Sequence, residues 1–169
     1  CRYRNAGEKQ HDRVDLIRSL TVSSDVYYYR IGESIYTNPG HPDTAIQDAA
    51  TEYGLGLESG ITLPFEQDGY LPTPANRRLR HEENPVAFPE WGWSTGDNVI
   101  TAIGQGEVLV TPLQLANAFA TFANGGVRLA PNVVDRVVGR DGSTVRTFGP
   151  RALSTVDIQS GFRTRVLEG

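Results

Sequence analysis

The clearest hydrophobic pattern in the chain lies in the stretch IGQGEVLVTPLQLANAFATFANGG, which begins at position 103. Its apolar residues recur at the spacing of one helix face, and they are Leu115, Ala116, Phe119, Phe122 and Ala123. Thr111 suits the N-cap, Pro112 the first helical position, and Gly125 the left-handed position after the helix. The pattern predicts a buried helix at the centre of a core, after a tight loop bracketed by Gly104 and Gly106.

Shorter helical patterns lie on both sides of this stretch. Asp12 is a candidate N-cap for a helix whose apolar face would be Val14, Ile17 and Leu20. A second helix is expected after the Ser-Ser-Asp sequence at 23–25, because Ser and Asp are preferred N-caps. A third would begin at Pro42 and end before Gly54, and Ser154 is a candidate N-cap for the last helix.

Two other segments carry different signals. Valine-rich runs at 133–138 and 144–148 flank an Asp-Gly turn and predict a β-hairpin. The proline-rich segment 65–96 predicts a long irregular loop, although its aromatic side chains favour partial burial over disorder. Three arginines in this loop are interpreted as a solvated basic patch, namely Arg77, Arg78 and Arg80.

The composition narrows the class of protein. The chain has 169 residues, 38% of them hydrophobic and 21% charged, which suits one globular domain. Its net charge of -4 argues against a nucleic-acid partner. The single cysteine excludes an internal disulfide and a multi-cysteine metal site, and no apolar run approaches the ~20 residues of a membrane helix. Because the chain opens on Cys1 and contains no Met, we expect an internal segment of a longer protein.

Several motifs resemble one enzyme family. The pattern I-G-Q-G-x-x-x-V-T-P-L-Q-L-A-x-A-x-A-x-x-A-N-G-G is similar to a signature of the penicillin-binding transpeptidases, most closely the class B, elongation-type enzymes. The patterns G-x-G-x-x-[ST]-G-I-x-L-P-x-E-x-x-G-x-x-P at 54–72 and W-x-x-G-D-N at 93–98 resemble the same family. The resemblance implies an α+β fold of the penicillin-binding-protein and β-lactamase kind, here mainly helical, with a β-hairpin near the C-terminus.

The Ser-x-Asp sequence at 23–25 resembles the second active-site motif of these enzymes, Ser-x-Asn. The resemblance implies that Ser23 and Asp25 are the catalytic and substrate-binding residues of this chain. Acyl transfer by a serine requires that a proton leave the nucleophile and reach the leaving amine, and a second hydroxyl can relay it. Ser23 would be this relay, while Asp25 would orient a lysine ammonium or bind the substrate amide. Asp25 replaces the commoner Asn, so a carboxylate stands where an amide would both accept and donate.

The other two motifs of the family are missing from these residues. Lys9 is the only lysine, Ala6 stands where Ser-x-x-Lys would need its serine, and no Thr-Gly follows Lys9. We therefore predict that residues 1–169 form the central part of a transpeptidase domain. The Ser-x-x-Lys nucleophile would lie upstream and the Lys-Thr-Gly strand downstream, so the chain alone should have no acyl-transfer activity.

The family resemblance implies the function of the complete protein. It would be a peptidoglycan D,D-transpeptidase that cross-links stem peptides through a serine acyl-enzyme and is acylated by β-lactams. It would use no metal or organic cofactor, and would work with other cell-wall synthesis proteins at the outer face of the bacterial cell membrane, with its membrane anchor outside this chain. One alternative is a catalytically silent scaffold or sensor in cell-wall assembly. Another is a β-lactamase, which needs a water-activating base.

Overall fold

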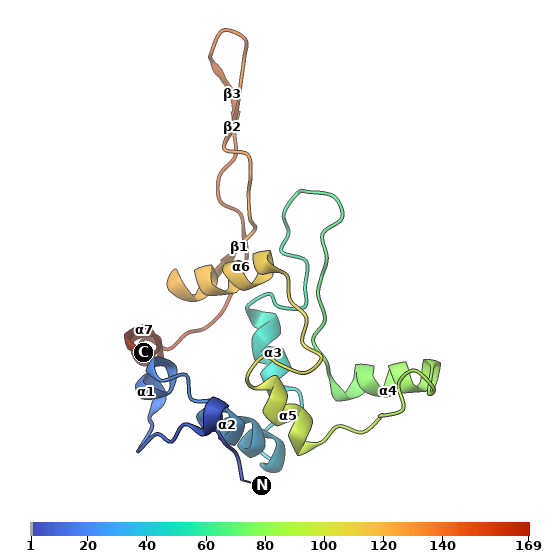
Figure 1. The fold of residues 1–169 in the computed structure, drawn as a ribbon. Coiled ribbons are helices and arrows are strands. Elements are labelled where there is room, and N and C mark those ends of the chain that lie inside the picture. The colour runs from blue at the N-terminus through green and yellow to red at the C-terminus, as the bar shows by residue number, and fades with distance from the viewer. Residues whose placement is uncertain (1) are drawn as a thin grey trace. The chain divides into compact units, whose positions relative to one another are not determined.

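The computed structural model describes residues 2–169 (Figure 1). The chain forms two compact units. The first contains the described residues up to Ala50, Tyr70–Leu109 and Gln159–Gly169, and the second contains Thr51–Gly69 and Val110–Ile158. None of the helices in the described residues has the length and apolar character of a membrane span.

The elements are mainly helices. The helices are η1 (Ala6–Glu8), α1 (Leu16–Thr21), α2 (Asp25–Thr37), α3 (Ala45–Glu52), α4 (Pro74–Glu83), α5 (Thr95–Thr101), α6 (Pro112–Ala123) and α7 (Ser160–Glu168). The strands are β1 (Val127–Leu129), β2 (Arg136–Val138), β3 (Thr144–Thr147) and β4 (Ala152–Thr155).

The first unit is built around the contact between α2 and α5. Gly32 allows this close approach, because a Cβ atom there would lie 2.9 Å from the carbonyl oxygen of Asn98. The fully buried Asn98 amide donates a 3.0 Å hydrogen bond to the carbonyl oxygen of Gly32. The Tyr36 hydroxyl on α2 donates to the carbonyl of Trp93 at 2.9 Å, just before α5. These bonds fix α5 beside α2.

Three predicted helix starts of the first unit are wrong. The N-cap of α1 is Asp15, not Asp12, and its carboxylate accepts the N–H of Arg18 at 2.9 Å. The third helix, α3, begins at Ala45 because Pro42 forms a turn, in which its carbonyl accepts the N–H of Ala45. The last helix begins at Ser160 with no side-chain cap, and the predicted cap Ser154 lies in β4 of the second unit.

The segment 65–96 is more regular than predicted. It contains α4, which starts with a capping box: Thr73 Oγ1 accepts the N–H of Asn76 at 3.1 Å, and the Asn76 side chain accepts the N–H of Thr73 at 2.7 Å. Pro74 follows at the first helical position, where its missing N–H costs nothing. A second capping box joins Ser94 and Asp97 at the start of α5. The prediction of an irregular loop overlooked these two capping boxes, which are local signals of a helix start.

The second unit contains α6 and two antiparallel strand pairs. The β2–β3 hairpin turns at Gly142, as predicted, and Figure 1 shows it as a long, extended two-stranded hairpin. The pairing of β1 with β4 was not predicted. Gly126 precedes β1 with φ +108°, and a Cβ atom there would lie 2.2 Å from the carbonyl oxygen of Val156. Only glycine fits this position, because both its backbone angle and its space exclude a side chain.

The ends of α6 are those predicted, but its burial is not. Thr111 and Gln114 form the N-terminal capping box, and Gly125 has φ +90° after the helix. The predicted core face is outward, since Leu115 is 46% exposed and Phe119 is 69% exposed. The buried Gln114 amide instead donates to the backbone carbonyls at 57 and 68, at 2.7 and 2.8 Å. Loop carbonyls need donors, so this polar residue faces inward.

Candidate active site

The Ser-Ser-Asp sequence forms the turn between α1 and α2. Ser23 adopts the left-handed conformation, with φ +51°, and its N–H donates to the carbonyl of Leu20 at 3.1 Å. This conformation costs a non-glycine residue roughly 1 kcal/mol, so the surrounding bonds must hold it. The N–H of Ser24 donates to the carbonyl of Ser19 at 2.9 Å and closes the turn.

The two serines of this turn have different surroundings. Ser24 is 3% exposed and is the N-cap of α2, where its hydroxyl accepts the N–H of Tyr27 at 3.4 Å. Ser23 is exposed, and within residues 2–169 its hydroxyl has no hydrogen-bond partner. The capping expected of this sequence is thus performed by its middle residue. The Ser23 hydroxyl remains available to a ligand.

Asp25 is the first residue of α2 and is half-buried. Its carboxylate accepts the N–H of Ala6 at 3.2 Å. A negative charge in the first helical turn is stabilised by the helix dipole. The structure therefore brings Ser23 and Asp25 together at the start of one helix, as predicted, while their chemical roles remain a prediction.

Asn5 is a neighbour of this turn that the sequence did not indicate. Its side-chain oxygen accepts the N–H of Val26 at 3.0 Å and lies 3.4 Å from the hydroxyl of Ser24. Its side-chain nitrogen donates to the carbonyl of Lys9 at 3.0 Å. Asn5 lies in a polar segment without a hydrophobic period, and its bonds to Ser24 and Val26 span about twenty residues of sequence, so no local pattern could reveal them.

Aromatic packing supports the first turns of α2. The Tyr28 hydroxyl lies 3.1 Å from Oγ of Ser19, which is fully buried in α1. The rings of Tyr3 and Tyr29 have their centroids 5.4 Å apart. Burial, with a smaller effect of a nearby carboxylate, raises the pKa of the Tyr3 phenol, which therefore stays neutral at physiological pH. α2 is thereby held on two sides.

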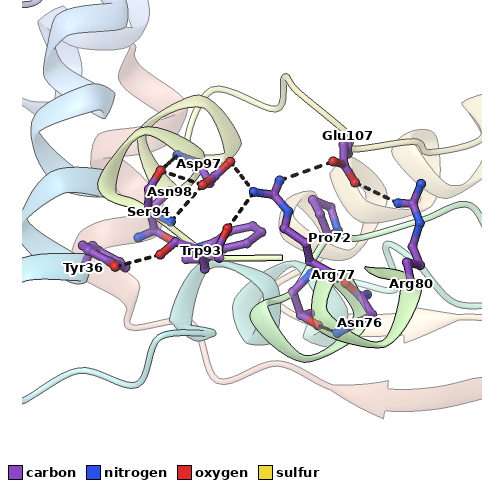
Figure 2. Close-up of polar contacts among 12 residues, drawn as sticks. Tyr36, Pro72, Asn76, Arg77, Arg80, Trp93, Ser94, Asp97, Asn98 and Glu107 are labelled. Carbon is purple, nitrogen blue, oxygen red and sulfur yellow. Dashed lines mark hydrogen bonds and ion pairs between the residues drawn. The ribbon is translucent and has the colours of Figure 1, made fainter. Parts of the chain in front are cut away.

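The arginines of α4 form a charged network, so their interpretation as a solvated patch is wrong for two of them (Figure 2). Arg77 is only 13% exposed and bonds the carboxylate of Asp97 at 2.6 Å and that of Glu107 at 3.3 Å. Arg80 bonds Glu107 at 2.9 Å and the Tyr70 hydroxyl at 3.0 Å. In Figure 2, Glu107 lies between the two guanidinium groups.

In this network the pKa of the Asp97 carboxyl is lowered. Burial raises the pKa of Asp97, but hydrogen bonds from Ser94 and Arg77 outweigh burial and hold that pKa below its ordinary value of 3.8. The ring of Trp93 lies against the Arg77 guanidinium, 4.7 Å from centroid to Cζ. Within the described chain, no hydrogen bond or ion pair joins Arg77 or Asp97 to Ser23 or Asp25. The network is a structural tie between α4, α5 and the loop at Glu107.

The described residues contain no group of three or more His, Cys, Asp and Glu side chains placed to hold a metal ion. The Ser-Ser-Asp turn itself presents the exposed hydroxyl of Ser23 and the half-buried carboxylate of Asp25. Such a pair can accept, donate and pass on a proton.

Comparisons with known proteins cover nearly the whole chain. Residues 2–166 match the family model described as penicillin binding protein transpeptidase domain. Peptidoglycan D,D-transpeptidase MrdA of Escherichia coli (strain K12) is 27% identical over 161 residues, which are 95% of this chain and 23% of that protein. For MrdA of Salmonella typhimurium (strain SL1344) the matched share of that protein is 21%. The chain thus spans less than a quarter of the length of these curated relatives.

Two solved structures show the same fold. PBP2 of Pseudomonas aeruginosa, solved in complex with WCK 5153, has a TM-score of 0.75 at 23% identity, over 97% of this chain and 33% of that chain. PBP2 of Helicobacter pylori, solved in complex with MreC, has a TM-score of 0.62 at 25% identity, over 94% and 24% respectively. The predicted α+β fold, mainly helical here with a hairpin near the C-terminus, is confirmed.

Proposed function

Because this chain belongs to the penicillin-binding protein transpeptidase domain family, we propose that it supplies the central part of a peptidoglycan D,D-transpeptidase domain. The match over residues 2–166, together with the short share of MrdA that the chain spans, supports this placement. The observation that carries the proposal is the Ser23 hydroxyl, which is exposed and without a partner in the described structure, at a turn closed by backbone bonds.

The proposed reaction is acyl transfer through a serine outside these 169 residues. That serine attacks the carbonyl of the D-Ala-D-Ala bond of a stem peptide, the C–N bond breaks, and the terminal D-Ala leaves as an amine. An acyl-enzyme remains, and the amine of a neighbouring stem peptide attacks it to form the cross-link. A β-lactam would acylate the same serine, and its opened ring would stay attached.

In this reaction Ser23 relays the proton. The nucleophilic serine loses a proton as it attacks, and the leaving amine must gain one. Ser23 can donate its own proton to the amine while accepting another from the general base. Asp25 would orient the lysine ammonium of the Ser-x-x-Lys motif or accept the N–H of the substrate amide. A left-handed turn and a helix start hold both groups on rigid backbone, which favours such positioning.

The location and partners of the complete protein follow from the same proposal. Cross-linking of peptidoglycan takes place at the outer face of the bacterial cell membrane, so a membrane anchor would lie outside this chain. The structure of Helicobacter pylori PBP2 with MreC supports the proposal that other cell-wall synthesis proteins bind the complete enzyme.

A fluorescent penicillin tests the proposal directly. The full-length gene product and the 169-residue chain are each incubated with it, and covalent bands are compared after denaturing electrophoresis. We expect labelling of the full-length protein only. Labelling of the 169-residue chain would contradict the placement of the nucleophile outside it. A folded full-length protein that takes no label would favour the silent scaffold or sensor.

A further inference from the structure

The first turn of α2 is held by a segment that lies about twenty residues earlier in the chain. The first N–H groups of a helix have no partner within the helix. Ser24 satisfies the N–H of Tyr27, and the side-chain oxygen of Asn5 satisfies the N–H of Val26 at 3.0 Å. Without Asn5, the N–H of Val26, the residue directly after Asp25, would lose this hydrogen-bond acceptor.

Asn5 and its neighbour Ala6 also contact the Ser23–Asp25 motif itself. Its oxygen lies 3.4 Å from the hydroxyl of Ser24, the residue between the two proposed functional groups. The next residue, Ala6, donates its N–H to the Asp25 carboxylate at 3.2 Å. The bond from Asn5 to the carbonyl of Lys9 folds this segment back on itself. One amide side chain thus fixes the backbone that binds Asp25.

From these contacts we infer that Asn5 is a positioning residue, whose side-chain oxygen holds the turn of α2 so that Ser23 and Asp25 keep their relation to the substrate. The inference rests on the proposed transpeptidase function. Reacting groups lose roughly 100-fold in rate when a change elsewhere displaces them by about 1 Å, so a single lost anchor has a measurable effect. Asn5 does not itself contact the reacting atoms.

The opposite end of α2 offers a matched control. Asn38 is the C-cap residue of α2, and its side-chain oxygen accepts the N–H of Gly40 at 3.0 Å. Replacing Asn38 with Ala removes a local bond at the same helix, of the same chemical type, far along the helix from Ser23. If Asn5 acted only on the stability of α2, its replacement would alter unfolding but leave the acylation rate of the folded protein unchanged, as expected for Asn38→Ala.

The test measures acylation of the full-length protein by a fluorescent penicillin over a range of concentrations. We expect Asn5→Ala to lower the limiting acylation rate about tenfold or more while the half-saturating concentration changes less than about twofold. Asn5→Asp keeps an oxygen acceptor for Val26, so its rate should return to within about threefold of wild type. Asn38→Ala should acylate at the wild-type rate. Thermal unfolding of each variant monitors stability.

The outcomes separate this inference from the proposed function. If wild type is labelled and Asn5→Ala is labelled equally fast, the positioning role is wrong while the transpeptidase proposal stands. Equal slowing by Asn38→Ala would assign the effect to general destabilisation and also overturn the inference. Slowing by Asn5→Asp as large as that by Asn5→Ala would show that the oxygen alone does not position the turn, because Asn5→Asp also removes the bond from the side-chain nitrogen to the Lys9 carbonyl. A folded wild type without label would overturn both proposals.

Discussion

At the turn between α1 and α2, two adjacent serines have separate tasks. Ser24 is buried and caps the helix, whereas Ser23 is exposed and has a free hydroxyl within the described structure. From the sequence, either serine was a candidate cap. The structure therefore makes it possible to remove the cap and the proposed proton relay independently.

Replacing Ser23 by Ala tests the relay. A positioned acid–base group contributes roughly 100-fold or more to rate, so Ser23→Ala should slow penicillin acylation of the full-length protein by about that factor. The measurement is the acylation rate constant from time-resolved labelling. Ser34→Ala, also exposed on α2, is the control and should react at the wild-type rate. Wild-type labelling of Ser23→Ala would remove this hydroxyl from the mechanism.

Replacing Ser24 by Ala tests the cap. Loss of an N-cap side chain costs typically about 1 kcal/mol, so Ser24→Ala should lower the free energy of unfolding by that amount. Ser23→Ala removes an exposed hydroxyl without a partner and should change it by less than about 0.5 kcal/mol. Urea unfolding of both variants checks the difference. Equal losses would mean that the cap is not specific to Ser24.

At the scale of elements, the sequence predicted both ends of α6 but not the face that this helix buries. The start and end of α6 follow from Thr111, Pro112 and Gly125, whose local preferences need no partner. Its orientation depends on Gln114, which satisfies loop carbonyls that the helical pattern does not include. The turn at Ser23 was equally local and was predicted, whereas the contact from Asn5 is non-local and was not. The buried face of α6 and the contact of Asn5 with α2 thus depend on tertiary contacts, which local sequence patterns do not contain.

The contact between α2 and α5 predicts an unequal response of two helical glycines. Gly32→Ala would place a Cβ atom 2.9 Å from the backbone oxygen of Asn98, and such overpacking costs roughly 1 to 3 kcal/mol. Gly161 in α7 has open space, so Gly161→Ala should be neutral or stabilise by up to about 1 kcal/mol. Thermal and urea unfolding compare the two. A stabilising Gly32→Ala would contradict the close packing described.

The tie between α4 and α5 predicts a pH-dependent contribution to stability. Because the folded pKa of Asp97 lies below 3.8, its ionised form stabilises the fold above that pH, and this contribution is lost as pH falls through the lowered pKa. Asp97→Asn should therefore lower the free energy of unfolding at pH 7 by roughly 1 to 3 kcal/mol. The difference from wild type should shrink towards pH 3. Urea unfolding at both pH values measures it, and a difference independent of pH would contradict the assignment.

At the scale of the whole chain, much apolar surface is accessible. Phe119 and Leu115 are exposed on α6 in the second unit, and the valines of the β2–β3 hairpin are exposed too. Exposed apolar patches of this kind are unusual on a soluble monomer. Part of this exposed surface belongs to α6, the helix that the sequence pattern predicted to be buried.

A dye that fluoresces on apolar surface should detect this property. We expect the 169-residue chain to bind the dye, and the double replacement Leu115→Ser and Phe119→Ser to weaken the signal markedly. Phe119 is mostly exposed and Leu115 about half exposed, so the unfolding temperature should fall only modestly. Phe65, which is 93% exposed in a loop outside α6, gives the control Phe65→Ser, for which little loss is expected. An unchanged signal in the double variant would exclude α6 as the binding surface.

At Ser23, selection for stable folding and selection for the proposed proton relay should favour different residues. Glycine relieves the left-handed backbone conformation of this turn but has no hydroxyl, so Ser23→Gly should fold at least as well as wild type and relay no proton. In a library of all substitutions at this position, cellular abundance would then rank glycine near the top. If Ser23 relays the proton as proposed, growth that depends on cross-linking would rank glycine near the bottom. The difference between the two ranks of glycine would separate the effect of position 23 on function from its effect on folding.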